Sequence, residues 1–159
     1  MRKTRFVMIF TCCVLAVAVF AWAQCGKAGL WEVTSTTTFQ QSPMPGGIPG
    51  MGGPHTTQVC VSQAQVDKYS GPPPQQRGDC QLSNYVKTAD GFSTNVACTG
   101  RTAMSGTVEA HYTADGHGTT KMHLTGSMQG KPLEMTTVSE STYKGADCGS
   151  VKPLPMLDK

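Results

Sequence analysis

Hydrophobic and polar residues alternate along most of the chain after residue 28. Between Trp31 and Phe39 the even-numbered positions hold Glu32 and a series of threonines, while the larger apolar side chains fall on odd-numbered positions. A period of two, combined with many β-branched residues, predicts a β-strand with one buried face. The residues expected on that face are Trp31, Val33, Thr37 and Phe39.

Six further segments are also predicted to be strands, and one segment is predicted to be a short helix. The strands are expected at 56–61, 80–88, 92–100, 103–113, 118–128 and 133–143. The helix is predicted at residues 62–70, with Ser62 as its N-cap. The predicted fold class is all-β: an antiparallel meander of about seven strands in chain order, forming a barrel-like or strongly curved sheet. A β-sandwich is the alternative.

The tetrapeptide Thr-Ala-Asp-Gly occurs twice, ending at Gly91 and at Gly116. Asp-Gly between two alternating segments is a strong hairpin signal. Around Gly116 the apolar residues of both strands are even-numbered, so the numbers of cross-strand partners must add up to an even number. A three-residue loop ending in glycine meets this condition. It predicts a type I turn with a G1 bulge and positive φ at Gly91 and Gly116.

The first 23 residues have the layout of a secretory signal peptide. Three basic residues precede an apolar run of 15 residues from 6 to 20, and small residues follow at Ala21 and Ala23. The run is shorter than the roughly 20 apolar residues that a bilayer span needs. We therefore expect cleavage after Ala23 and no transmembrane anchor afterwards.

Cleavage would leave a mature chain of 136 residues, which is the size of one domain. We expect a single β-domain over 24–148, with a flexible Met/Pro/Gly loop at 42–54 and a C-terminal tail at 149–159. The mature chain has ten basic and ten acidic residues, because three of the 13 Lys and Arg belong to the signal peptide. It has no cluster of basic residues, which argues against nucleic acid as a partner.

Five cysteines remain in the mature chain, and cysteines of exported proteins are usually paired. Cys25 lies next to the new N-terminus and is the expected free thiol, with lipidation as a less favoured alternative because Gln24 precedes it. If the connection 61–79 crosses the sheet, the favoured pairs are Cys80–Cys98 and Cys60–Cys148. The alternative pairs are Cys60–Cys80 and Cys98–Cys148.

The Cys80–Cys98 bond needs one further condition. A three-residue turn at Gly91 would place Cys98 opposite Leu82, and Cys80 would be only a diagonal neighbour. Bridging therefore requires a local shift of register in this hairpin.

The Met/Pro/Gly loop contains a candidate metal site. Met44, Met51 and His55 offer two thioethers and an imidazole, which suit Cu(I). Closing a loop so rich in glycine and proline around an ion would cost much conformational entropy, so a plain connection between two strands is the simpler interpretation. His111, His117 and His123 lie near one hairpin and are expected on the surface.

The predicted inward face is a candidate ligand site. Methionine suits adaptable apolar surfaces, and a small barrel can enclose one apolar ligand. An ordinary core packed with methionine is the alternative interpretation. The candidate pocket residues are Trp31, Phe39, Met104, Tyr112, Met122, Met128 and Met135.

Two groups of residues carry a resemblance to a known family. They are Gly29-Leu30-Trp31-Glu32-Val33 and the ordered cysteines Cys60, Cys80, Cys98 and Cys148, with the flanking stretches "TTQVCVS", "CQLSNY", "VACTG" and "YKGADC". Together they resemble the bacterial exported family called domain of unknown function 3617, over about Gly29 to Cys148. The resemblance implies a periplasmic or secreted bacterial β-domain, and it implies no activity.

The function predicted from the sequence is non-enzymatic. The chain has no G-x-S-x-G, H-E-x-x-H or phosphate-loop motif, and we expect neither catalysis nor a cofactor. A binding module for a small apolar ligand is the first hypothesis. A Cu(I)-binding protein and a structural or protein-interaction domain of the cell envelope are the alternatives.

Overall fold

The computed structural model describes residues 26–44, 48, 50, 52–74, 78–99 and 102–155. The predicted signal peptide, Cys25 and Met51 lie outside these residues. The described chain forms one helix and a single seven-stranded antiparallel sheet, which confirms the predicted fold class. The elements are β1 (Gly29–Gln41), β2 (Gly53–Val61), α1 (Gln63–Tyr69), β3 (Cys80–Lys87), β4 (Gly91–Cys98), β5 (Thr102–Tyr112), β6 (His117–Met128) and β7 (Lys131–Gly145).

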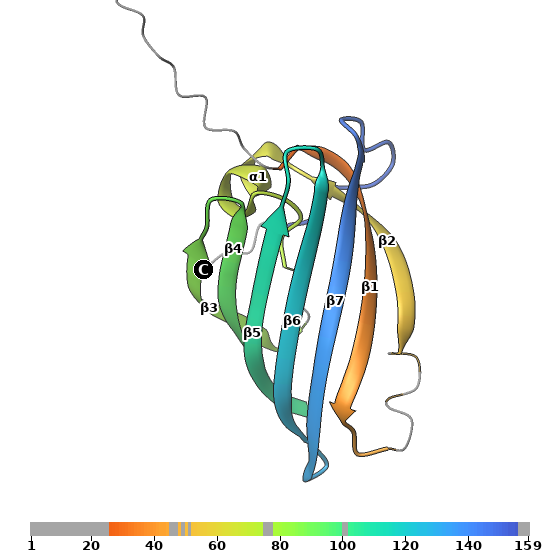
Figure 1. Ribbon diagram of the computed structural model, residues 1–159, viewed down its shortest axis with the longest axis vertical. Helices are drawn as coiled ribbons and strands as arrows, with labels where there is room; N and C mark the ends of the chain where they lie inside the picture. The colour runs from red at the N-terminus through yellow and green to blue at the C-terminus, as the bar shows by residue number, and fades with distance from the viewer. Residues whose placement is uncertain are drawn as a thin grey trace, which may run out of the picture.

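The strand order is β2-β1-β7-β6-β5-β4-β3, so the first strand lies between β2 and the last strand. Strands that are consecutive in the chain pair with each other, except β2 and β3, which form the two edges of the sheet because β1 pairs with β7. The connection through α1 crosses from one edge strand, β2, to the other, β3, as the favoured cysteine pairing requires. Figure 1 shows one strongly curved sheet with α1 at one end, so the alternative of a two-sheet sandwich is wrong.

The hairpin between β5 and β6 has the predicted register. Tyr112 pairs with Gly118, and the numbers of all partners in this hairpin add up to the same even number. The amide of Gly116 donates to the carbonyl oxygen of Thr113 at 3.0 Å, and the amide of Thr113 donates to that of His117 at 2.8 Å. Gly116 has a φ of 95°, so the three-residue loop with its left-handed glycine is confirmed.

The hairpin between β3 and β4 differs from the prediction. The amide of Thr88 donates to the carbonyl oxygen of Gly91 at 3.0 Å, which leaves a two-residue loop, and the φ of Gly91 is not positive. Glycine is required here for a different reason. A Cβ on Gly91 would lie 1.8 Å from the carbonyl oxygen of Ala110 on β5, so the close approach of two backbones excludes a side chain.

The register shift that the Cys80–Cys98 bond needs comes in two steps, one residue from the two-residue loop and one residue from a bulge in β3. The bulge lies between Ser83 and Val86, and Asn84 within it has a φ of 51°. Beyond it Cys80 pairs directly with Cys98, and the two form a disulfide. The second disulfide joins Cys60 to Cys148, so the favoured pairing is confirmed and the alternative pairing is wrong.

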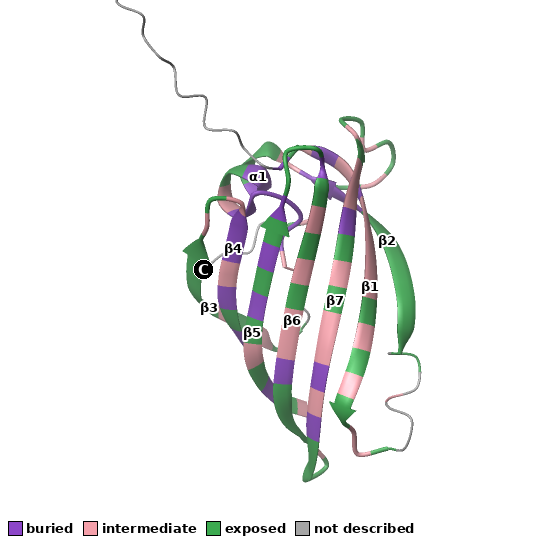
Figure 2. Ribbon diagram, in the orientation of Figure 1, coloured by how far each residue is buried: buried purple, intermediate pink, exposed green. Residues whose placement is uncertain are grey.

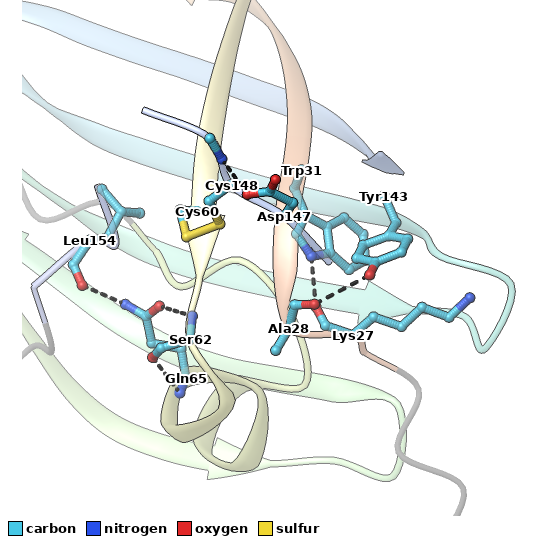
Figure 3. The surroundings of a disulfide bond; sticks show 11 residues. Lys27, Ala28, Trp31, Cys60, Ser62, Gln65, Tyr143, Asp147, Cys148 and Leu154 are labelled. Atoms are coloured by element: carbon cyan, nitrogen blue, oxygen red, sulfur yellow. Dashed lines mark hydrogen bonds between the residues drawn. A yellow bond between two sulfur atoms is a disulfide. The ribbon is translucent and has the colours of Figure 1, made fainter. Parts of the chain in front are cut away.

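The Cys60–Cys148 bond fastens the chain after β7 to the end of β2, beside α1 (Figure 3). Further along, the amide of Leu154 donates to the carbonyl oxygen of Cys60 at 3.4 Å. The fully buried Gln65 donates to the carbonyl oxygen of Leu154 and accepts from the amide of Ser62, both at 2.8 Å. Ser62 in turn accepts from the amide of Gln65, so the predicted N-cap of α1 is confirmed as a capping box.

The core lies on the concave face of the sheet, where α1 packs against it. Along β5 buried and exposed positions alternate, as predicted for a strand with one buried face (Figure 2). No helix among the described residues is long and apolar enough to span a bilayer. The buried core residues are Trp31, Val59, Val61, Val66, Tyr69, Phe92, Val96, Met104, Val108, Ala110, Tyr112, Leu124, Leu133 and Met135.

Candidate functional site

The concave face is filled by aromatic side chains near α1. Trp31 and Tyr112 are 0% and 1% exposed, and their rings meet edge to face. The indole of Trp31 donates to the carbonyl oxygen of Lys27 at 2.8 Å, and the hydroxyl of Tyr112 donates to that of Pro72 at 2.7 Å. Burial raises the pKa of Tyr112 well above its ordinary value, so this hydroxyl stays neutral. The structure thus places these two predicted pocket residues within the core.

The same face keeps partly exposed apolar side chains away from α1. Phe39 on β1 and Met122 and Met128 on β6 are half-buried and pack against the margin of the core. We call these three residues the open end. Met104 and Met135 also lie on this face, but they are 9% and 8% exposed. The structure therefore gathers all the predicted pocket residues on one face, and those of the open end retain the most accessible surface.

Hydroxyl side chains from β1 and β7 lie on the concave face between the aromatic region and the open end. The Oγ atoms of Ser35 and Ser139 are 2.8 Å apart, and so are the Oγ1 atoms of Thr37 and Thr137. Ser141 follows on the same face of β7 and is 3% exposed. We call these five residues the hydroxyl floor. It borders the open end, because Thr137 is the direct cross-strand partner of Met122.

Thr37 was the one member of the hydroxyl floor expected on the inward face, and no member was among the candidate pocket residues, although the position of the floor follows from a simple signal. Its members on β1 share odd numbering with Trp31 and Phe39, and those on β7 share it with Leu133 and Met135. That parity places them on the inward face. Their small polar side chains do not fit the pattern of an apolar pocket, so composition alone does not single them out.

Apart from Lys131 at the start of β7, which is the direct cross-strand partner of Met128, the charged side chains of β1, β5, β6 and β7 lie on the opposite, convex face. The inward positions of β1, β5 and β6, and those of β7 from residue 133 to 143, hold no Asp, Glu, Lys or Arg. The convex face carries the other charged residues and a shallow hollow of about 330 Å³. That hollow is lined by Thr107, Glu109, Lys121, His123 and Thr136.

The candidate Cu(I) ligands are placed only in part. Met44 is 38% exposed, and Met51 lies outside the described residues. His55 belongs to β2, which begins at Gly53, so the loop ends earlier than the predicted residue 54. Within the described ranges, no three His, Cys, Asp or Glu side chains lie close enough to hold a metal ion. The Cu(I) site stays a prediction.

Two histidines form pairs with carboxylates at partly exposed positions. His111 Nδ1 lies 3.0 Å from Asp90 Oδ2, and His123 Nε2 lies 3.1 Å from Glu134 Oε1. The hydrogen bond from His111 is the main reason why the pKa of Asp90 lies below its ordinary value. In the observed register His111 and His123 are not cross-strand partners, as predicted.

The family of the chain follows from a comparison with known protein families. Residues 26–148 match the family model described as Protein of unknown function (DUF3617). The chain belongs to the DUF3617 family. The match spans all seven strands and both disulfides, so the open end and the hydroxyl floor are parts of the DUF3617 domain. Neither a curated protein nor a solved structure matches the chain.

Proposed function

We propose that this DUF3617 protein is a non-enzymatic binding module that holds a small apolar ligand at the open end of its concave face. The observation that carries the proposal is the exposure of Phe39, Met122 and Met128 on a face that elsewhere forms the core. Small-molecule sites are typically concave and mostly apolar, with a few polar groups that orient the ligand. Methionine side chains adapt to ligands of different shapes, because they are unbranched and polarisable.

We also propose that the protein acts in the periplasm or outside the cell. The N-terminal basic and apolar pattern is typical of a signal peptide. The two disulfides support the same location, because disulfides persist in oxidising compartments and are rare in the cytosol. An apolar molecule that crosses such a compartment needs a protein to shield it from water, which is the role proposed for the open end.

Titration with N-phenyl-1-naphthylamine, an uncharged apolar fluorophore, tests the binding proposal on the mature protein. We expect a saturable rise in its fluorescence. Met122→Glu should weaken binding at least about tenfold, because a carboxylate would have to be desolvated against the probe. The matched control is Val138→Glu, because Val138 is 39% exposed and faces Lys121 on the convex side.

The control and a conservative variant separate loss of binding from loss of folding. Val138→Glu should bind the probe as the unmodified protein does, and Met122→Leu should retain most of the affinity. Circular dichroism should show the same β-spectrum for all variants. The proposal is overturned if the probe gives no saturable signal, or if Met122→Glu binds as tightly as Val138→Glu.

A further inference from the structure

The hydroxyl floor narrows the chemistry of the ligand, and this inference rests on the function proposed above. Ser35 and Ser139 share one hydrogen bond, and Thr37 and Thr137 share another. A hydroxyl has one donor and two acceptor lone pairs, so each of these pairs still has a donor and several lone pairs free. All four side chains are half-buried, so their unused positions are accessible from the concave side.

Ser141 provides an independent observation on the same surface. The residue is 3% exposed, and its hydroxyl forms no side-chain hydrogen bond with any described residue. Buried hydroxyls are normally hydrogen-bonded, because a missing partner costs free energy. Among the described residues no fully enclosed side-chain oxygen or nitrogen lacks a partner, so the remaining exposed surface of Ser141 includes its hydroxyl. A ligand oxygen beside Ser139 would supply that partner.

The charge distribution disfavours an ionic ligand at the hydroxyl floor itself, although Lys131, the direct cross-strand partner of Met128, lies on the same face at the start of β7. The inward positions that surround the floor on β1, β5, β6 and β7 hold no Asp, Glu, Lys or Arg from residue 31 to 39 or from 133 to 143. An ionised group placed there would lose its hydration without gaining a counter-charge. His55 on β2 lies opposite Ser35 and shares its face of the sheet.

We infer that the ligand is an uncharged amphiphile with a sugar-like or polyol-like polar part. Its hydrocarbon part lies on Phe39, Met122 and Met128, and its hydroxyl or ether oxygens bind the hydroxyl floor. The two surfaces are contiguous, since Met122 and Thr137 are direct cross-strand partners. A ligand that spans this boundary makes apolar contacts with the open end and hydrogen bonds with the hydroxyl floor.

Three probes with the same decyl chain test the inference: decyl glucoside, undecanoate and decyltrimethylammonium. Each probe is titrated against the complex of the mature protein with N-phenyl-1-naphthylamine, and displacement is followed by the loss of fluorescence. The probes are used below their critical micelle concentrations and at pH 8, where an ordinary histidine is neutral. We expect decyl glucoside to compete at a concentration at least about tenfold lower than either ion, which corresponds to about one additional hydrogen bond.

Paired Thr→Val substitutions keep the shape of the side chains and remove the hydroxyls. Thr37→Val with Thr137→Val should reduce the affinity for decyl glucoside about tenfold and leave that for N-phenyl-1-naphthylamine unchanged. The matched control is Thr34→Val with Thr56→Val, which removes a hydroxyl pair 2.9 Å apart between β1 and β2 at positions of the opposite parity. The control should keep the preference for decyl glucoside.

The outcomes distinguish this inference from the proposed function. If N-phenyl-1-naphthylamine binds but the three probes compete equally, or an ion competes best, the floor does not select an uncharged ligand and the inference fails alone. The same conclusion follows if the floor and control variants behave alike. If N-phenyl-1-naphthylamine itself does not bind, the proposed function fails.

Discussion

Removal of the Cys60–Cys148 bond should destabilise the protein more than removal of the Cys80–Cys98 bond. The first joins residues 88 positions apart and the second joins residues 18 positions apart. The relation between loop length and chain entropy gives about 4.6 kcal/mol of stabilisation for the first and about 3.2 kcal/mol for the second at 25 °C. The difference arises because tying the ends of a longer loop removes more freedom from the unfolded chain.

Two double variants test this order: Cys60→Ala with Cys148→Ala, and Cys80→Ala with Cys98→Ala. Each keeps the other disulfide, and urea unfolding without reductant, followed by far-ultraviolet circular dichroism, gives the free energies of unfolding. We expect the first variant to lose about 1.4 kcal/mol more than the second. Equal losses, or a larger loss for the second variant, would refute the reasoning, because loop length would then not set the stabilisation.

Three further predictions concern single residues. Gly91→Ala should cost about 2–3 kcal/mol in urea unfolding, because its Cβ would meet the Ala110 carbonyl oxygen, whereas Gly52→Ala, with open space around it, should change stability little. Gln65→Ala should cost about 2–3 kcal/mol by the same assay, since it removes two hydrogen bonds from a buried site; an unchanged midpoint would contradict this. In an NMR titration, His111→Ala should raise the pKa of Asp90 toward its ordinary value. Because the pKa of Asp90 is lower in the folded protein, this contact stabilises the fold fully at pH values above the ordinary pKa of an aspartate. That stabilisation is lost as the pH falls through the pKa of Asp90 in the folded protein.

The local parts of the fold could be predicted from the sequence because they depend on short-range patterns. Parity along each strand sets which side chains face inward, and Asp-Gly with that parity sets the loop at Gly116. The N-cap at Ser62 follows from a residue type that hydrogen-bonds the free amides of a helix. None of these features requires knowledge of distant contacts.

The long-range parts could not be read from the same patterns. The pairing of β1 with β7 joins Ser35 to Ser139, which are 104 residues apart, and no short-range pattern marks it. The bulge at Asn84 places a non-glycine residue at positive φ, which no turn signal marks. Its effect becomes visible only when Cys80 and Cys98 are seen to pair.

In the candidate site, too, the local pattern could be predicted from the sequence and the long-range packing could not. Parity places Trp31, Tyr112 and Met122 on one face, but it does not say which part of that face α1 and the following segment cover. The structure shows that Tyr112 bonds to Pro72 beneath this cover, while Met122 remains half-buried. The difference between core and candidate site is therefore a property of tertiary packing.

Native mass spectrometry of the protein recovered from the compartment to which we propose it is exported tests the central claim most directly. The account predicts that the unmodified protein and Val138→Glu retain an organic molecule of the same mass, and that Met122→Glu is recovered without it. An unmodified protein that carries no organic mass, or a Met122→Glu variant that carries the same mass, would contradict the claim that the open end holds a ligand.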